Sequence, residues 1–155
     1  MSGNKMAHVK FVGKEYCDAS SVRNLINYCI NPKATKNYVG YINLTPYCTV
    51  EELVKVSRYW GFENLDESKL IHIVISFSPY EFVSKDEALE LGYEFARHYS
   101  DRFQMVFGVH TDTDNIHLHF AIGAISFIDG SEFPISHPKT TEFRRYVGQV
   151  MNGHE

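Results

Sequence analysis

The stretch FQMVFGVHTDTDNIHLHFAIGAISF, residues 103–127, predicts two β-strands joined by a short polar turn. Residues 103–110 and 116–127 are rich in the β-branched and aromatic side chains that favour strands. The TDTDN segment between them has residue types that hydrogen-bond their own backbone and so favour a turn. Because the two strands are so close in sequence, we expect them to pair as an antiparallel hairpin.

Side-chain alternation gathers three histidines on one face of this hairpin. Successive side chains of a strand point to opposite faces. In the second strand one face carries Ile116, Leu118, Phe120 and Ile122, and the other carries His117, His119, Ala121 and Gly123. We expect the first set to face a helix-covered core, and the small residues of the second set to leave room over the sheet. His110 ends the preceding strand and, in a hairpin, comes beside His117 and His119.

Three imidazoles that leave a coordination position open are the arrangement of a catalytic metal centre. We therefore expect a divalent cation on His110, His117 and His119. Asp112 stands two residues after His110, where its carboxylate can accept a ring N–H and fix the tautomer. Mg or Mn is the expected cation in the cell. Ligand softness alone favours Mn, Co, Ni or Zn over Mg, so a crystal can hold a metal that the cell does not use, such as Zn, Ni or Co. The alternative is three solvated histidines, with aspartates that only serve the turn.

The rest of the chain predicts an α+β fold: a mostly antiparallel central sheet with helices packed mainly on one face. Further strands are expected at 8–12 and 70–79, and helices at 20–31, 49–62, 84–102 and 140–151. Residues 33–48 are expected to form an ordered loop, with a short strand within YVGYIN. Residues 1–7 are interpreted as a tag remnant or disordered end, and residues 8–151 as one domain.

Composition narrows the class of protein. The 155 residues are 44% hydrophobic and 14% aromatic, which excludes a disordered chain. No apolar run approaches the roughly 20 residues of a membrane helix, and no secretory signal is recognisable, so a cytoplasmic protein is expected. Three cysteines without a Cys-x-x-Cys spacing suit reduced thiols. The net charge of −4 argues against coating duplex DNA through charge alone, and leaves room for a local basic groove.

Several motifs together resemble those of conjugative relaxases, a family of HUH nucleases. HTDTDNIHLHF (110–120) resembles their third motif. LIHIVISFSPYEFVSKDEALELGYEFA (70–96) is similar to the second conserved block of MOBP-class mobilisation relaxases from Gram-positive plasmids and integrative elements. NLINYCINPKAT (24–35) resembles their first block, and GYINLTP (40–46) and SFIDGSEF (126–133) follow in the right order. The resemblance covers about residues 20–146 and implies an HUH, ferredoxin-like palm fold.

The resemblance implies a bacterial enzyme that nicks single-stranded or hairpin DNA at a transfer origin and so starts conjugative transfer or mobilisation. Tyr28 matches the tyrosine that attacks the DNA phosphate, forms a 5′-phosphotyrosine link and frees a 3′ hydroxyl. The histidine triad matches the metal ligands. Tyr38, Tyr41 and Tyr47 are the rival nucleophiles in the following loop. Accessory relaxosome proteins and a coupling protein are the implied partners. Because such relaxases usually carry a further C-terminal region, we expect the chain to correspond to the nuclease domain.

Other residues are weaker candidates for the site. His72 shares a strand face with Val74 and Ser76; it contacts DNA or the surroundings of the metal, or is simply a partly buried histidine. Asn115 touches the site or holds the turn. Candidate DNA contacts are Arg23, Lys33, Lys36, Tyr38, Tyr41, Arg144 and Arg145, each of which also suits an ordinary surface role. Gly123 departs from the family, which often has asparagine there.

Three other functions compete with the relaxase interpretation. A rolling-circle replication initiator shares its fold and chemistry, but the first two blocks argue against it. A non-catalytic DNA-binding remnant would keep only a vestigial metal site. An unrelated three-histidine hydrolase would not need Tyr28. Detection of a covalent protein–DNA adduct that depends on Tyr28 separates the relaxase from the last two.

Overall fold

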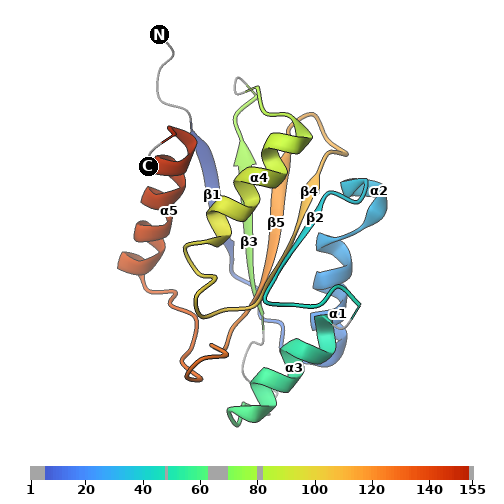
Figure 1. Cartoon of the computed structure of the whole chain (residues 1–155), viewed down its shortest axis with the longest axis vertical. Coiled ribbons are helices and arrows are strands. Elements are labelled where there is room, and N and C mark those ends of the chain that lie inside the picture. Colours follow the sequence, from blue (N-terminus) through green and yellow to red (C-terminus); the bar gives the residue numbers. More distant parts are fainter. Residues whose placement is uncertain (1–5, 48, 63–69, 80–81, 154–155) are drawn as a thin grey trace.

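The structure, a computed structural model, describes residues 6–47, 49–62, 70–79 and 82–153 (Figure 1). Residues 1–5, most of the predicted tag remnant or disordered end, lie outside the described residues, whereas Ala7 already begins a strand. The strands are β1 (Ala7–Val12), β2 (Val39–Ile42), β3 (Leu70–Phe77), β4 (Met105–His110) and β5 (His117–Gly123). The helices are α1 (Ala19–Cys29), α2 (Pro32–Thr35), α3 (Thr49–Tyr59), α4 (Lys85–Ala96) and α5 (His137–Met151).

Within the described residues, five strands form one sheet in the order β1-β3-β5-β4-β2, and every neighbouring pair is antiparallel. The predicted α+β fold with an antiparallel sheet is therefore confirmed. β4 and β5 pair as the predicted hairpin, with His110 opposite His117 and Gly108 opposite His119. β5 is the central strand, so β3 and β4 flank the strand that carries two of the three histidines.

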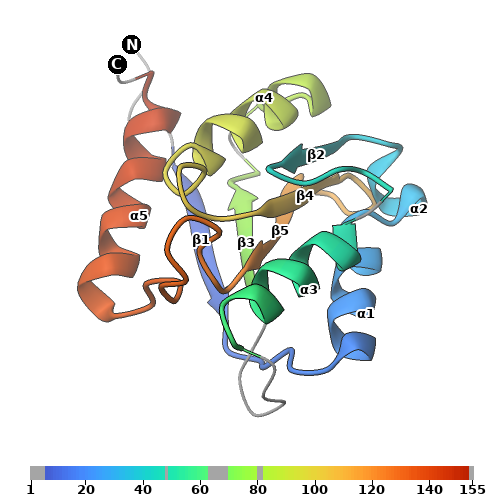
Figure 2. The same ribbon diagram turned by 60° about the horizontal axis from the view of Figure 1, so that its bottom comes forward.

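The two longest helices, α4 and α5, cover the apolar face of the sheet (Figure 2). The core on this side is aromatic: Phe107 stacks on Phe120 with ring centroids 4.9 Å apart, and Phe95 and Phe103 are fully buried. Side chains of β5 on this face are the predicted apolar set. Strand alternation thus selects the buried face, and this burial holds the histidine-bearing face turned the other way.

α1 and α3 pack on the histidine face, so helices are not confined to one side of the sheet. Their contact is a second, smaller core in which Leu25 and Cys29 of α1 and Leu53 of α3 meet Val106 and Ala121 of the sheet. The room that Ala121 and Gly123 leave over the sheet is therefore filled by these helices. A side chain at Gly123 would press on Leu53, which accounts for the small residue at this position.

Several element boundaries differ from the expectation. Residues 32–35 form a short helix, α2, because Asn31 caps the main-chain N–H of Lys33 and proline suits a first helical position. β5 ends at Gly123, and beyond it Ile125 forms only an isolated bridge with Glu132. α4 ends at Ala96 and α5 begins at His137. Over the described parts of the chain, no helix is both long and apolar enough to cross a bilayer.

Candidate active site

The structure brings the three predicted ligands together. His110, His117 and His119 each offer one nitrogen, and these three atoms all lie within 4.8 Å of one another. The His119 ring lies 4.3 Å from the His110 ring and 4.9 Å from the His117 ring, measured between centroids. The antiparallel register of β4 and β5 produces this cluster, since it sets His110 directly opposite His117.

Hydrogen bonds identify which nitrogen of each ring is available. His110 Nε2–H donates to the carbonyl oxygen of Cys29 at 2.9 Å, because a carbonyl can only accept. His117 Nδ1–H donates to the carbonyl oxygen of Asn115 at 3.0 Å. The lone pairs of His110 Nδ1 and His117 Nε2 are then left for a ligand. His119 Nε2 is buried and has no hydrogen-bond partner within the described residues.

These features fit a divalent cation. A buried imidazole nitrogen without a partner is costly unless a ligand satisfies it. Burial lowers the pKa of His119 to about 3 and, less strongly, the pKa of His110, and the neighbouring histidines add to the effect at His119. The lowered pKa values of His119 and His110 favour their neutral rings at pH 7, the form that binds metal.

The hydrogen-bond partners of the three triad rings differ from the expected partner, Asp112. Among the described hydrogen bonds, none joins Asp112 to a histidine ring: the partners are Cys29, Asn115 and His72. Asp112 is exposed on the turn, and its carboxylate acts on His110 and Tyr28 through charge. Asn115 contributes its main-chain oxygen, which also accepts from the Thr113 hydroxyl. The expectation for Asp112 fails because the neighbouring α1 supplies the acceptor for His110 instead.

Tyr28 lies against the triad. Its ring centroid is 4.9 Å from that of His119 and 5.3 Å from that of His110, and half of its side chain is exposed. Gly108 makes this approach possible, because a Cβ at that position would collide with the carbonyl oxygen of Cys29, the residue after Tyr28. Burial raises the pKa of the Tyr28 phenol, and the charge of Asp112 raises it further.

The rival tyrosines lie elsewhere. Tyr38 packs against the core under α4, and its hydroxyl donates to Asp86 at 2.9 Å. Tyr41 packs against the core of α1 and α3, and Tyr47 is 96% exposed. Of these four candidate nucleophiles, all within the described residues, Tyr28 is the one whose ring packs on the triad histidines. Tyr38 and Tyr41 face opposite sides of the sheet, so they do not form one stacking platform.

A cavity of about 290 Å³ adjoins Tyr28 and His72. Its lining also includes Lys14, Tyr16 and Asn24. No sequence pattern pointed to Lys14, which lies in the connection between β1 and α1, with its ammonium 5.7 Å from the centre of the Tyr16 ring. The cavity therefore places a cation and several polar groups next to the candidate nucleophile.

The predicted cationic contacts are divided between the faces. α2 is tied to the residue after His110 by the bond from Thr111 N–H to Ala34 O, 2.8 Å, so Lys33 and Lys36 lie near that end of the sheet. Arg23 lines a groove between α1 and α3, together with Lys55, Arg58 and one carboxylate, Glu51. The predicted DNA contacts did not include Lys55 and Arg58. Lys55 and Arg58 are three residues apart on one helix, the spacing that could have revealed them.

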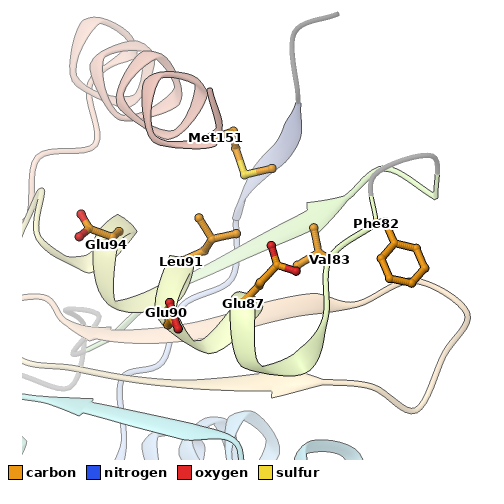
Figure 3. A pocket seen from close by; sticks show the side chains of 7 residues that line it. All are labelled: Phe82, Val83, Glu87, Glu90, Leu91, Glu94 and Met151. Atoms are coloured by element: carbon orange, nitrogen blue, oxygen red, sulfur yellow. The ribbon is translucent and has the colours of Figure 1, made fainter. Parts of the chain in front are cut away.

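Arg144 and Arg145 are not brought to the triad. They belong to α5, on the opposite face of the sheet, where the Arg144 guanidinium lies 5.3 Å from the centre of the Phe11 ring. The same side of the sheet carries a pocket lined by three glutamates of α4, Glu87, Glu90 and Glu94, and by apolar side chains that include Leu91 and Met151 (Figure 3). Carboxylates repel phosphates, so this pocket is a poor path for DNA.

The fold and the site define a class: an antiparallel α+β domain of the HUH palm type, with a candidate three-histidine metal centre under a tyrosine. The chain belongs to the relaxases, because the family model described as "Relaxase: MobA/VirD2-like, nuclease domain" matches residues 28–154. The match begins at Tyr28 and contains the whole triad. No curated protein matches the chain.

Proposed function

We propose that this protein is a metal-dependent relaxase that nicks one DNA strand by tyrosine transesterification, with Tyr28 as nucleophile. The observation that carries the proposal is the packing of the Tyr28 ring on His110 and His119. Membership of the relaxase family supports it independently. That membership also favours a relaxase over a rolling-circle replication initiator.

In the proposed reaction the Tyr28 oxygen bonds to the scissile phosphorus, and the bond from phosphorus to the 3′ oxygen of the preceding nucleotide breaks. The phenolic proton is released, and the departing oxygen is protonated to a 3′ hydroxyl. The phosphotyrosine ester conserves the energy of the broken bond, so the strand can be rejoined by the reverse reaction. A cation on His110, His117 and His119 would polarise the phosphate and offset its developing charge.

The charge distribution supports single-stranded DNA on the histidine face. Lys14 lines the cavity next to Tyr28, and in the groove between α1 and α3 three cations, Arg23, Lys55 and Arg58, outnumber the single carboxylate of Glu51. These cations suit phosphates, and the 290 Å³ cavity offers space beside the nucleophile. The acidic pocket on the other face suits a protein that holds DNA on one side only, in spite of a net charge of −4.

Further details of the proposal rest on the motif resemblance. They are the MOBP class, an origin in a Gram-positive plasmid or integrative element, nicking at a transfer origin, and action in the bacterial cytoplasm. Mg or Mn is the proposed cation in the cell. Accessory relaxosome proteins and a coupling protein are the proposed partners.

The test uses single-stranded oligonucleotides from the transfer origin of the element, Mn²⁺, and a denaturing gel. With a 3′-end label, wild-type protein should carry the label as a covalent adduct, because Tyr28 keeps the 5′ phosphate of the downstream fragment. With a 5′-end label, a shorter free fragment with a 3′ hydroxyl should appear. Tyr28→Phe should lower adduct formation by at least about 10³-fold, the order of effect seen when a nucleophile is removed.

Tyr47→Phe is the matched control, since Tyr47 is almost fully exposed and lies in the rival loop. An adduct that persists in Tyr28→Phe would refute this nucleophile. Cleavage without any adduct would instead indicate a hydrolase, and metal binding with neither product would indicate a non-catalytic remnant.

A further inference from the structure

A buried hydrogen-bond chain leads away from the candidate metal centre. His72 Nε2 lies 3.0 Å from His119 Nδ1, and His72 Nδ1 lies 3.2 Å from the Tyr16 hydroxyl. The three side chains are 5–8% exposed. His72 comes from β3, where Val74 pairs with His119, so His72 and His119 are diagonal neighbours on the same face.

The direction of the hydrogen bonds follows from the chemistry of a neutral imidazole, which has one N–H and one lone pair. If His119 Nε2 is a ligand atom, its proton must be on Nδ1, and Nδ1–H donates to His72 Nε2. His72 then carries its own proton on Nδ1 and donates it to the Tyr16 oxygen. In the reverse arrangement His72 Nε2–H donates to His119 Nδ1, so the His119 proton must be on Nε2. A protonated Nε2 has no lone pair with which to bind a metal.

We propose that His72 and Tyr16 are positioning residues that set the tautomer of His119 and so present its Nε2 to the cation. The Tyr16 oxygen accepts a hydrogen bond from His72 Nδ1–H, so the lone pair of His72 Nε2 is available to accept from His119 Nδ1–H. This proposal rests on the metal centre of the proposed function. It assigns a role to Tyr16, which lies outside every motif of the sequence, and gives His72 one of the alternatives that the sequence left open.

The arrangement has a consequence for the charge of the site. The three ring N–H groups are held by two main-chain carbonyls and one neutral imidazole, and none of these acceptors carries a negative charge. A carboxylate in such a position would oppose part of the charge of the cation. Here the ligands and these hydrogen-bond acceptors are all neutral, so they would offset none of the charge of a bound cation; the exposed Asp112 carboxylate acts on His110 through charge and not through a ring hydrogen bond.

The experiment measures Mn²⁺ affinity of the full chain without DNA, by the electron paramagnetic resonance signal of free Mn²⁺. His72→Leu should weaken binding roughly 10–100-fold, the usual effect of losing the group that holds a ligating histidine. His72→Gln should recover most of the affinity, because its amide oxygen can accept from His119 Nδ1–H. Tyr16→Phe keeps the ring under Lys14 and removes only the hydroxyl, and should weaken binding severalfold.

His98→Leu is the control for loss of a partly buried histidine, since His98 follows α4 and packs on Phe143 and Tyr146 of α5, on the other face of the sheet. It should leave Mn²⁺ affinity unchanged. The second readout is the tautomer of His119 from long-range ¹⁵N–¹H spectra of the Zn²⁺-bound and metal-free protein. Both should show the proton on Nδ1 in the wild type, and the metal-free spectrum should change in His72→Leu.

Unchanged Mn²⁺ affinity in His72→Leu, or a wild-type His119 protonated on Nε2, would overturn the proposal. The proposal would also be overturned if His72→Gln bound Mn²⁺ no better than His72→Leu, because the role of His72 would then be steric only. These outcomes are independent of nicking. Adduct formation together with unaltered Mn²⁺ affinity in His72→Leu would refute the positioning role of His72 and Tyr16 alone. Mn²⁺ affinity that responds to these substitutions as expected, without any adduct, would refute only the proposed function.

Discussion

At the scale of single residues, burial decides the protonation of the candidate site. Burial lowers the pKa of His72 to about 4 and that of His119 to about 3, from an ordinary value of 6.5. Both rings stay neutral in the folded protein at pH values where the unfolded chain would protonate them. The His119 ring can thus bind a cation at neutral pH without first losing a proton.

The same burial predicts an acid-sensitive fold in the metal-free protein. Between about pH 4 and 6.5 the unfolded state binds more protons at these rings, so the free energy of unfolding falls as the pH drops through that window. Above pH 6.5 both states are neutral and the rings contribute no pH dependence. Each ring contributes on the order of 1 kcal/mol per pH unit.

Urea unfolding at pH 7.5 and pH 5.0 checks this prediction. His72→Gln should lose less stability between the two pH values than the wild type, by about 1–2 kcal/mol. His8→Gln, a change at an exposed histidine of β1, should behave like the wild type. Equal acid sensitivity of His72→Gln and the wild type would contradict the prediction.

At the scale of elements, the docking of α1 on β4 assembles the site. Asp18 caps α1 by accepting the main-chain N–H of Ser21 at 2.7 Å, and the buried face of the helix packs on the sheet. Its C-terminal end supplies both the Tyr28 ring and the carbonyl that holds His110. Gly108 sets how closely the helix can approach, since only hydrogen fits between β4 and the Cys29 carbonyl.

Gly108→Ala should therefore separate α1 from the triad. We expect a loss of about 1–3 kcal/mol in the free energy of unfolding, as for other overpacked sites. We also expect a large fall in adduct formation, because the added methyl displaces Tyr28 and the acceptor of His110 together. Urea unfolding and the adduct gel measure the two effects.

Gly148→Ala is the matched control. Gly148 lies within α5, and a Cβ there would meet nothing within 4 Å. Replacing a helical glycine by alanine should stabilise the protein by about 0.5–1 kcal/mol and leave adduct formation unchanged. Normal adduct formation in Gly108→Ala would show that the close approach of α1 is not needed.

At the scale of the whole molecule, the sheet separates two chemically different sides. The triad, Tyr28 and Lys14 lie on the side of α1, and the glutamates of α4 line a pocket on the other side. A protein with net charge −4 can bind DNA in this way, because the attraction depends on the local cations rather than on the total charge.

Salt dependence of DNA binding tests this division. Lys14→Gln should weaken binding of a single-stranded oligonucleotide and reduce the slope of log affinity against log salt by about 0.7, the value for one neutralised phosphate. Arg145→Gln, on α5, should change neither quantity. Fluorescence anisotropy at several salt concentrations measures both, in the metal-bound Tyr28→Phe background so that no strand is cut. Equal effects of the two substitutions would contradict the assignment of the DNA side.

The motif around the histidines allowed much of the fold and the cluster to be predicted. Strand alternation and the nearby turn are local properties, so the hairpin and the shared face of His110, His117 and His119 follow from residues 103–127 alone. Local patterns were less informative about α2, Lys14 and Tyr16. These residues follow no hydrophobic periodicity, and their positions depend on how the segments around α1 pack on the sheet.

The sequence by itself therefore determined the antiparallel hairpin, the converging histidines and the resemblance to relaxases that the family match confirms. Only the tertiary structure decided which nitrogen of each ring is left for a cation. Two of the deciding partners are remote: Cys29 is 81 residues from His110, and His72 is 47 residues from His119. Alternation along a strand orients a side chain, but the proton on its ring is placed by whichever acceptor the packing brings alongside.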